Sequence, residues 1–381
     1  MLGKLFWLLF SLWLGAIMSQ SGSTASADES LVFATSFVAG ENGAIQAYRL
    51  DVAAGALKPV HRTTGIENPY FIVVSRDQKF LYSINAKSFG GTEPEQVAAY
   101  ALEGRTGKMK FLNRQSTRGT ASCYLDIDAT GKSVLVANYS TGDVAALPVK
   151  ADGSLGEAAS YFKHSGSSVN PERQKSPNAH CFVISPDNRF AFACDLGIDQ
   201  VLSYRLDAAT AKLSPNQPSF AKTPAGAGPR HLTFHPGGKY VYVINELKSS
   251  VTLFDYVAET GVMTERQTTS TLPPDFTGVS HCADVKVTPN GRYLYGTNRG
   301  HDSIAAFRIA DDGKLTLIAN EPSLGKTPQN LAIVGEGSLL LCANMSGNNL
   351  VVFRIDADTG RLKPVGNPIE LTSPSCIRIL P

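Results

Sequence analysis

Seven side chains of the kinds used in acid–base chemistry and in oxyanion binding lie at or near the ends of predicted strands between residues 180 and 301. They are four histidines, two arginines and a glutamate: His180, Arg230, His231, Glu246, His281, Arg299 and His301. A histidine or a glutamate can take a proton from water, and arginine forks match planar oxyanions. Brought together, these groups could activate water for attack on an ester carbonyl and stabilise the charge that forms there.

The chain that carries these residues repeats one strand–turn–strand unit. In its clearest copy, Gly228–Tyr256, β-branched and aromatic residues recur at period two and are interrupted by Gly, Pro and Asn. This pattern predicts antiparallel strands joined by tight turns. A marker residue ends the second strand of each unit, at intervals of 53, 57, 50, 53 and 46 residues: Asn85, Asn138, Asp195, Asn245, Asn298 and Asn344. A turn position always lies nine residues upstream of the marker, so the strand–turn–strand unit has a constant length and only the outer loops vary in length.

A seventh copy precedes these six, with Thr35 in the place of the asparagine. Each copy continues with a third strand and a more polar fourth strand, and four-stranded units at a period of about 40–50 residues are typical of β-propeller blades. The sequence therefore predicts an all-β, seven-bladed β-propeller, as a single domain over residues 28–381. The first copy lacks its leading strand, and Ser375–Leu380 has the pattern of such a strand. We expect this C-terminal strand to complete the N-terminal blade and remove an open sheet edge.

Two positions of each blade should meet at one mouth of the central channel, because first strands line the channel and the turns after second strands open on the same face. The first-strand position holds Tyr70, Cys123, His180, Arg230, Ala283 and Gln329, and the residue after the marker is Ala86, Tyr139, Leu196, Glu246, Arg299 or Met345. His231, His281 and His301 lie within one or two residues of these positions. We therefore expect a concave site rich in His, Arg and Glu.

Each of these residues also has a structural interpretation. His180 alone fits a core histidine bonded to a backbone carbonyl, and Arg230 and Arg299 could bridge neighbouring blades with Glu246 as their ion-pair partner. As a set, convergent His, Arg and Glu at a concave site favour a functional pocket. Cys181 faces Cys194 across a predicted hairpin, which leaves both a disulfide and two free thiols open.

The N-terminus has the composition of a secretory signal peptide. Lys4, the apolar run Leu5–Ile17 and the small residues Ala25–Ala27 predict a signal over residues 1–27, with a retained signal anchor as the alternative. We therefore expect a periplasmic or secreted protein, with no membrane attachment after signal removal. Its 35 basic and 33 acidic residues, without a basic tract, argue against a nucleic-acid partner.

Other classes of site lack their sequence motifs. The six cysteines have no metal-ligand spacing, and no Walker loop, GxSxG or HExxH motif occurs. The expectation is a site without metal or cofactor that takes a small-molecule substrate. Whether the protein is a monomer or a dimer is left open.

At the level of motifs, the chain resembles the seven-bladed lactonase family that includes bacterial propeller-type 6-phosphogluconolactonase and the fungal carboxy-cis,cis-muconate cyclase. The resemblance extends from about Leu31 to Leu380 and rests on Gly228–His231, Asn245–Leu247, Asn298–Ile304 and Asn178–His180, the last with Asn178 in place of the family's proline. It implies that His180, Arg230, Glu246 and Arg299 form the catalytic site. The export signal departs from the cytoplasmic lactonases of the family and puts the 6-phosphogluconolactone substrate in doubt.

These observations lead to one main hypothesis and two alternatives. The main hypothesis is hydrolysis of a sugar-derived lactone, with Glu246 or His180 as the base, Glu246 preferred, and with Arg230 and Arg299 on the oxyanion or on an anionic group of the substrate. His231, His281 and His301 would support substrate binding. The alternatives are a non-catalytic secreted binding or scaffold propeller, and a cyclase or isomerase that forms the lactone.

Overall fold

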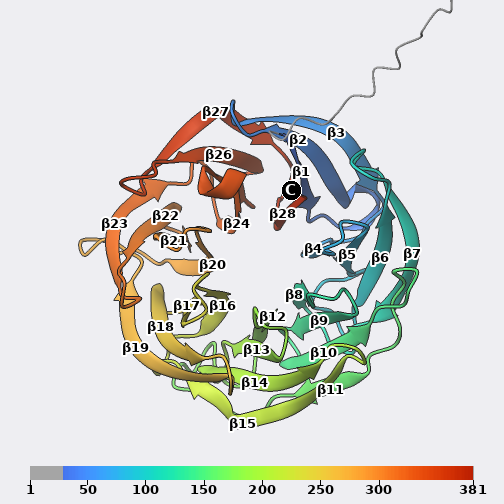
Figure 1. Cartoon of the computed structure of the whole chain (residues 1–381), viewed down its shortest axis with the longest axis horizontal. Coiled ribbons are helices and arrows are strands. Elements are labelled where there is room, and N and C mark those ends of the chain that lie inside the picture. The colour runs from blue at the N-terminus through green and yellow to red at the C-terminus, as the bar shows by residue number, and fades with distance from the viewer. Residues whose placement is uncertain (1–28, 381) are drawn as a thin grey trace, which may run out of the picture.

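Seven four-stranded antiparallel sheets are arranged in a ring around a central axis in the computed structural model, which describes residues 29–380 (Figure 1). We number the blades along the chain. Blade 1 consists of β28 (Ile377–Leu380), β1 (Glu29–Ser36), β2 (Ala44–Asp51) and β3 (Ala56–Thr64). Blade 2 consists of β4 (Ile72–Val74), β5 (Phe80–Asn85), β6 (Gln96–Leu102) and β7 (Met109–Ser116). Blade 3 consists of β8 (Ser122–Ile127), β9 (Ser133–Asn138), β10 (Asp143–Pro148) and β11 (Ser160–Lys163).

The remaining blades follow the same order from the channel outward. Blade 4 consists of β12 (Ala179–Ile184), β13 (Phe190–Asp195), β14 (Gln200–Asp207) and β15 (Lys212–Lys222). Blade 5 consists of β16 (Pro229–Phe234), β17 (Tyr240–Asn245), β18 (Ser250–Val257) and β19 (Val262–Ser270). Blade 6 consists of β20 (His281–Val287), β21 (Tyr293–Arg299), β22 (Ser303–Ile309) and β23 (Leu315–Pro322). Blade 7 consists of β24 (Pro328–Val334), β25 (Leu339–Asn344), β26 (Asn349–Ile355) and β27 (Leu362–Glu370). Two short 3₁₀ turns lie at Gly40–Asn42 and Gly335–Gly337.

The ring closes as the sequence predicts. β28 pairs with β1 in register from Leu31 opposite Leu380 to Ala34 opposite Ile377, and it contacts β4 and β24 on either side. The Thr35 hydroxyl lies 2.9 Å from that of Ser375, and its backbone amide donates to Cys376. Both predictions, of seven blades and of closure by the C-terminal strand, are confirmed.

The marker asparagines are buried, and those of blades 3, 6 and 7 join the preceding blade to their own turn, whereas the Asn245 amide bonds within blade 5. Asn138 Nδ2 donates to the Thr117 carbonyl at 3.0 Å, at the end of the preceding blade, and to Asp143 Oδ1 at 2.6 Å. Asn298 forms the corresponding pair of bonds, to the Thr271 carbonyl and to Ser303. Where both bonds form, the marker satisfies its buried amide and ties its turn to the preceding blade.

A tyrosine–glycine contact recurs between blades. Tyr242 in β17 donates its hydroxyl to the Gly313 carbonyl at 2.8 Å in the next blade, and Tyr295 donates to Gly360 at the same distance. Gly313 has a φ of +80° and lies against the Tyr240 ring, so a Cβ there would meet both backbone strain and the ring. The alternating Tyr-Val-Tyr pattern therefore supplies contacts between blades.

The six cysteines are buried free thiols. Cys181 and Cys194 lie opposite each other in the β12–β13 strand register, as the sequence predicts, without a disulfide between them. The predicted signal peptide, residues 1–27, lies outside the described residues. Within residues 29–380, no helix has the length and apolar character needed to cross a bilayer.

Candidate active site

A β-bulge recurs in the innermost strand of blades 3 to 7 and sets the geometry of the channel mouth. In four of these blades, the extra residue left out of the strand pairing is Cys123, His180, Arg230 or Gln329. In blade 6, Ala283 and Asp284 together lie opposite the single residue Thr297. The Thr297 hydroxyl accepts a hydrogen bond from the Asp284 backbone amide. A bulge redirects the side chain of the unpaired residue. In blades 3 to 7, the first-strand positions selected from the sequence are therefore these bulges, whereas Tyr70 precedes β4 in a blade whose inner pair is regular.

Glu246 is the centre of an ionic cluster at the mouth. Its Oε2 accepts Arg230 Nε at 2.9 Å and pairs with Arg299 Nη2 at 2.8 Å, and its Oε1 accepts Arg173 Nη2 at 2.8 Å. The exposed fraction of the side chain falls from 37% for Arg173 to 21% for Arg299, 7% for Glu246 and 1% for Arg230. The cluster thus extends from the solvent-facing mouth to a fully enclosed guanidinium.

The electrostatics of this cluster keep Glu246 ionised. Burial alone would raise the pKa of Glu246, but the charges of Arg299 and Arg230 outweigh it and hold the pKa well below its usual value. Three guanidinium groups around one carboxylate leave an excess of two positive charges. The mouth is therefore suited to an anionic ligand.

Arg173 was missed by the sequence analysis because it belongs to the connection between β11 and β12, outside the repeated unit. That connection is fixed by Gln174, whose Nε2 donates to the Leu196 carbonyl and to Asp199 Oδ1, both at 2.8 Å. The Arg173 amide is also bound by Asn170 Oδ1 at 3.0 Å. The one available signal was the interval of 57 residues before Asp195, the longest between markers, which points to additional chain at this place.

His180 lies beside the cluster with a neutral imidazole. Its Nδ1 is 3.6 Å from Cys123 Sγ, and its ring meets the rings of Tyr139 and His231 edge-on at 5.4 Å each. Burial, followed by the charge of Arg230, lowers the pKa of His180 well below its usual value. The ring is therefore uncharged at neutral pH, and a protonated His180 would be only a transient species.

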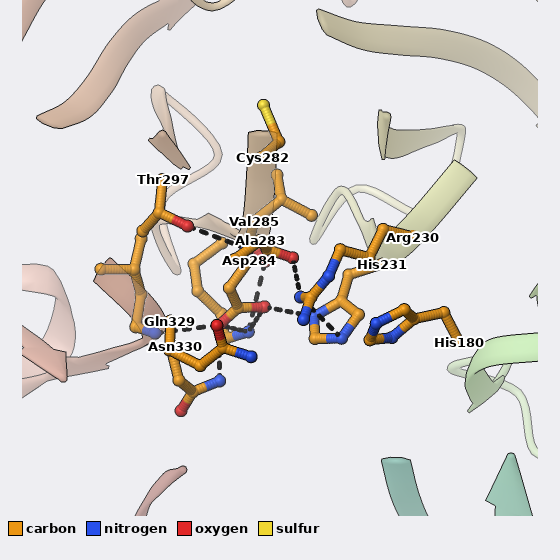
Figure 2. Close-up of polar contacts among 12 residues, drawn as sticks. His180, Arg230, His231, Cys282, Ala283, Asp284, Val285, Thr297, Gln329 and Asn330 are labelled. Carbon is orange, nitrogen blue, oxygen red and sulfur yellow. Dashed lines mark hydrogen bonds and ion pairs between the residues drawn. The ribbon is translucent and has the colours of Figure 1, made fainter. Parts of the chain in front are cut away.

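A second polar layer lies below Arg230 and involves His231 (Figure 2). His231 Nδ1 is 2.9 Å from Asp284 Oδ1, and its Nε2 is 3.4 Å from Arg230 Nη1. Because arginine can only donate, His231 Nε2 accepts and Nδ1 carries the proton that it donates to Asp284. Burial and the charge of Arg230 lower the pKa of His231 to about 3, so the ring stays neutral.

Asp284 is fully buried and was not selected from the sequence. Besides His231, it accepts Lys286 Nζ at 2.7 Å, Asn330 Nδ2 at 2.7 Å and the Leu331 amide at 2.9 Å (Figure 2). Burial would raise its pKa, but Lys286 and the bond from His231 lower it far below the usual range. Asp284 is thus a permanent anion that orients the groups beneath Arg230.

The other two candidate histidines are placed differently. His301 Nδ1 lies 2.7 Å from Ser303 Oγ in its own turn, and its ring contacts Phe276 edge-on at 4.8 Å. His281 begins β20, and its Nδ1 is buried without a hydrogen-bond partner among the described residues. The structure therefore brings together His180, Arg230, Glu246 and Arg299, with His231 beneath them. His281 contacts the cluster through its backbone, because its carbonyl accepts a hydrogen bond from Arg299 Nε at 3.3 Å, whereas the described contacts of the His301 ring lie outside the cluster.

Comparisons with known proteins agree with this architecture. The family model for lactonase, 7-bladed β-propeller, matches residues 31–379. The 6-phosphogluconolactonase of Bacillus subtilis is 34% identical over 346 residues, covering 90% of this chain and 96% of the relative. The 6-phosphogluconolactonase of Formosa agariphila is 29% identical over 346 residues, covering 88% and 95%. Among solved structures, the periplasmic gluconolactonase of Pseudomonas aeruginosa is 31% identical with a TM-score of 0.86, covering 93% of this chain and 99% of that one. The chain therefore belongs to the seven-bladed β-propeller lactonase family and is a lactone-hydrolysing enzyme.

Proposed function

We propose that this lactonase opens a sugar-derived lactone that carries an anionic group, and that it does so at the Glu246 cluster. The observation that supports this substrate class is the excess of two positive charges at the mouth. Donors also remain for a ligand, because Arg230 Nη2 and Arg299 Nη1 form no hydrogen bond within residues 29–380. Guanidinium donors of this kind match a carboxylate or a phosphate.

We assign the base to His180 and a positioning role to Glu246. The Glu246 carboxylate already accepts hydrogen bonds from three arginines, and taking a proton would break these ion pairs. The neutral His180 ring has no charged partner to lose when it takes a proton. Glu246 instead fixes the directions of Arg230 and Arg299, so that their free donors are already oriented before the substrate arrives.

The reaction then proceeds by water attack. His180 takes a proton as the water oxygen bonds to the lactone carbonyl carbon, and Arg230 with Arg299 stabilises the oxyanion. When the bond between that carbon and the ring oxygen breaks, His180 returns the proton to the leaving alkoxide, which yields the open hydroxy acid. Arg173, the most exposed of the three arginines, binds the anionic substituent of the substrate.

A lactone panel tests this proposal. We would follow acid release in a pH-stat for a phosphorylated, a carboxylated and a neutral δ-lactone. Arg173→Ala should lower kcat/KM for the charged lactones about 10- to 100-fold, the equivalent of one lost bond to a charged group, and should leave the neutral lactone nearly unchanged. His180→Ala should lower kcat for every member of the panel by roughly 10²- to 10⁴-fold.

The matched control is Arg189→Ala, which removes an exposed arginine that pairs with Asp187 in the β12–β13 turn, away from the cluster. It should leave all rates unchanged. Equal turnover of neutral and charged lactones that is insensitive to Arg173→Ala would contradict the substrate class, and full activity of His180→Ala would contradict the base.

We also propose that the protein acts in the periplasm or outside the cell. Two observations support this: the signal-like composition of residues 1–27 and the likeness to a periplasmic gluconolactonase. Sequencing the N-terminus of the native protein after cell fractionation tests it, since an uncleaved chain in the cytoplasm would contradict the proposal.

A further inference from the structure

The residues around the channel mouth are divided by chemical type. The ionic cluster and His180 come from the turns and inner strands of blades 4 to 6 and from the connection that leads into blade 4. Blades 1 to 3 place aromatic residues around the same mouth: Phe37, Tyr70, Phe89 and Tyr139. Phe37 and Phe89 follow the second strands of their blades, as Glu246 does in blade 5, and Arg299 is the last residue of the second strand of blade 6. One half of the mouth is therefore aromatic and the other half ionic.

Phe37, Tyr70 and Phe89 form a continuous wall in the aromatic half. Phe37 meets Tyr70 and Phe89 edge-on at 5.0 Å each, and Tyr70 stacks with Phe89 at 4.9 Å. All three rings are only half-buried, so part of the wall remains open to solvent. We call these three residues the aromatic wall.

Tyr70 joins the wall to the ionic half. Its hydroxyl accepts Gln329 Nε2 at 2.6 Å, and Gln329 occupies the bulge position that Arg230 holds in blade 5. Burial raises the pKa of Tyr70, and the charges of Arg230 and Arg299 act on the same hydroxyl. The wall therefore begins next to the guanidinium groups of the ionic cluster.

The loop that carries Phe89 is held in place by a buried carboxylate. Glu95 accepts the backbone amides of Gly90 at 2.8 Å, Ala121 at 3.0 Å and Ser122 at 2.6 Å. These bonds attach the residue after Phe89 to the start of β8, next to Cys123. A ring fixed in this way loses little conformational entropy when a ligand packs against it.

We propose that the aromatic wall is the ring-binding subsite of the enzyme: it packs against the C–H face of a cyclic lactone while the arginines hold the anionic substituent. This inference rests on the proposed function and extends it to a second recognition element. An aromatic face and a charged patch on opposite halves of one mouth select a rigid ring with an anion on one side. A short acyclic ester would leave the wall uncovered.

Kinetics of Phe89→Ala test the subsite. Because the contact is made equally in the ground state and the transition state, KM for a cyclic anionic lactone should rise about five- to tenfold while kcat stays near that of the parent. The matched control is Phe111→Ala, which removes an exposed phenylalanine from the outer strand β7. It should leave KM unchanged. An unchanged KM in Phe89→Ala, or an equal rise in both variants, would overturn the subsite.

A fluorescence experiment separates the subsite from the reaction. The chain has two tryptophans, Trp7 and Trp13, both outside the described residues, so the parent protein serves as the blank for Phe89→Trp. Addition of the phosphorylated hydroxy acid product should change the emission of Phe89→Trp saturably and leave the emission of Phe111→Trp constant. Saturable binding without lactone turnover by the parent would support the subsite and refute the proposed reaction. Lactone turnover by the parent without a fluorescence change in Phe89→Trp would support the proposed reaction and refute the subsite.

Discussion

Replacing Asp284 with asparagine tests whether the buried layer beneath Arg230 positions that arginine. The carboxylate accepts donors on both oxygens, from His231 and Lys286 on one side and from Asn330 and the Leu331 amide on the other. An asparagine of the same shape has only one oxygen. If that oxygen stays with Leu331, the amide N–H groups face His231 Nδ1, so the imidazole proton must move to Nε2. There it would face Arg230 Nη1, another donor, at 3.4 Å.

The loss of folding free energy in Asp284→Asn follows from the hydrogen bonds that the substitution removes. A hydrogen bond to a buried charged group contributes about 1.5–3 kcal/mol, and the substitution removes two, the one from His231 and the Lys286 bond to Oδ1, while Lys286 keeps its bond to the remaining oxygen. Because the Lys286 side chain is 27% exposed and can turn to water, we take a total of about 3 kcal/mol. At roughly 2 °C per kcal/mol for a chain of this size, the melting temperature should fall by about 6 °C. If Arg230 shifts by about 1 Å, kcat should fall on the order of 100-fold.

The control is Asp128→Asn. Asp128 is also fully buried and accepts the amides of Thr130 and Ser133, but it lies in a β8–β9 turn at the opposite end of its strand from the mouth. Calorimetry should show that both variants are destabilised, and steady-state kinetics should show that only Asp284→Asn loses kcat. A kcat for Asp284→Asn within threefold of the parent, or equal losses in both variants, would refute the positioning role.

Two further predictions concern stability. The pKa of Glu246 is depressed in the folded protein, so its carboxylate stabilises the fold above the unfolded value of about 4.5, and this stabilisation is lost as pH falls below that value towards the folded pKa. Urea unfolding between pH 7 and pH 3 should therefore show a steeper fall in the free energy of unfolding for the parent than for Glu246→Gln, and parallel curves would count against the ion cluster. Deleting residues 374–381 removes β28 and exposes the edge of β1. The melting temperature should fall by more than about 10 °C, whereas deletion of Pro381 alone should change it little, and an unchanged value for the longer deletion would refute ring closure as a stabilising feature.

The fold could be predicted from the sequence because each blade is specified locally. Strand alternation, the tight turns and the marker asparagines all act within about 20 residues, and seven repetitions reinforce the same interpretation. Closure could also be predicted, since an incomplete first copy and an extra strand after Ser375 fit one another. What the repeat did not reveal is the tyrosine–glycine contact between blades, because Tyr242 and Gly313 are joined only in three dimensions.

The site was predicted as far as its residues occupy constant offsets in the repeat. Arg230, Glu246 and Arg299 were selected in this way, and the structure places them in direct contact. Arg173 and Asp284 were not selected, because the path of a non-repeated connection and the length of a bulge depend on packing with other blades. His281 and His301 also lie next to the selected positions, but closeness in sequence does not determine the direction in which a side chain points. Their roles in substrate binding stay predictions.

Ring closure by β28 has a consequence for how the enzyme is made. The bond between Thr35 and the Cys376 carbonyl joins residues 341 positions apart, so it forms only after nearly the whole chain has been synthesised. Hairpins within blades involve only local contacts, but the ring is incomplete until Ile377–Leu380 pairs with β1. A nascent chain that already carries Arg230 and Glu246 therefore has the reactive groups without the enclosed, water-poor surroundings that make them effective. We therefore expect activity to appear only after Ile377–Leu380 has joined β1.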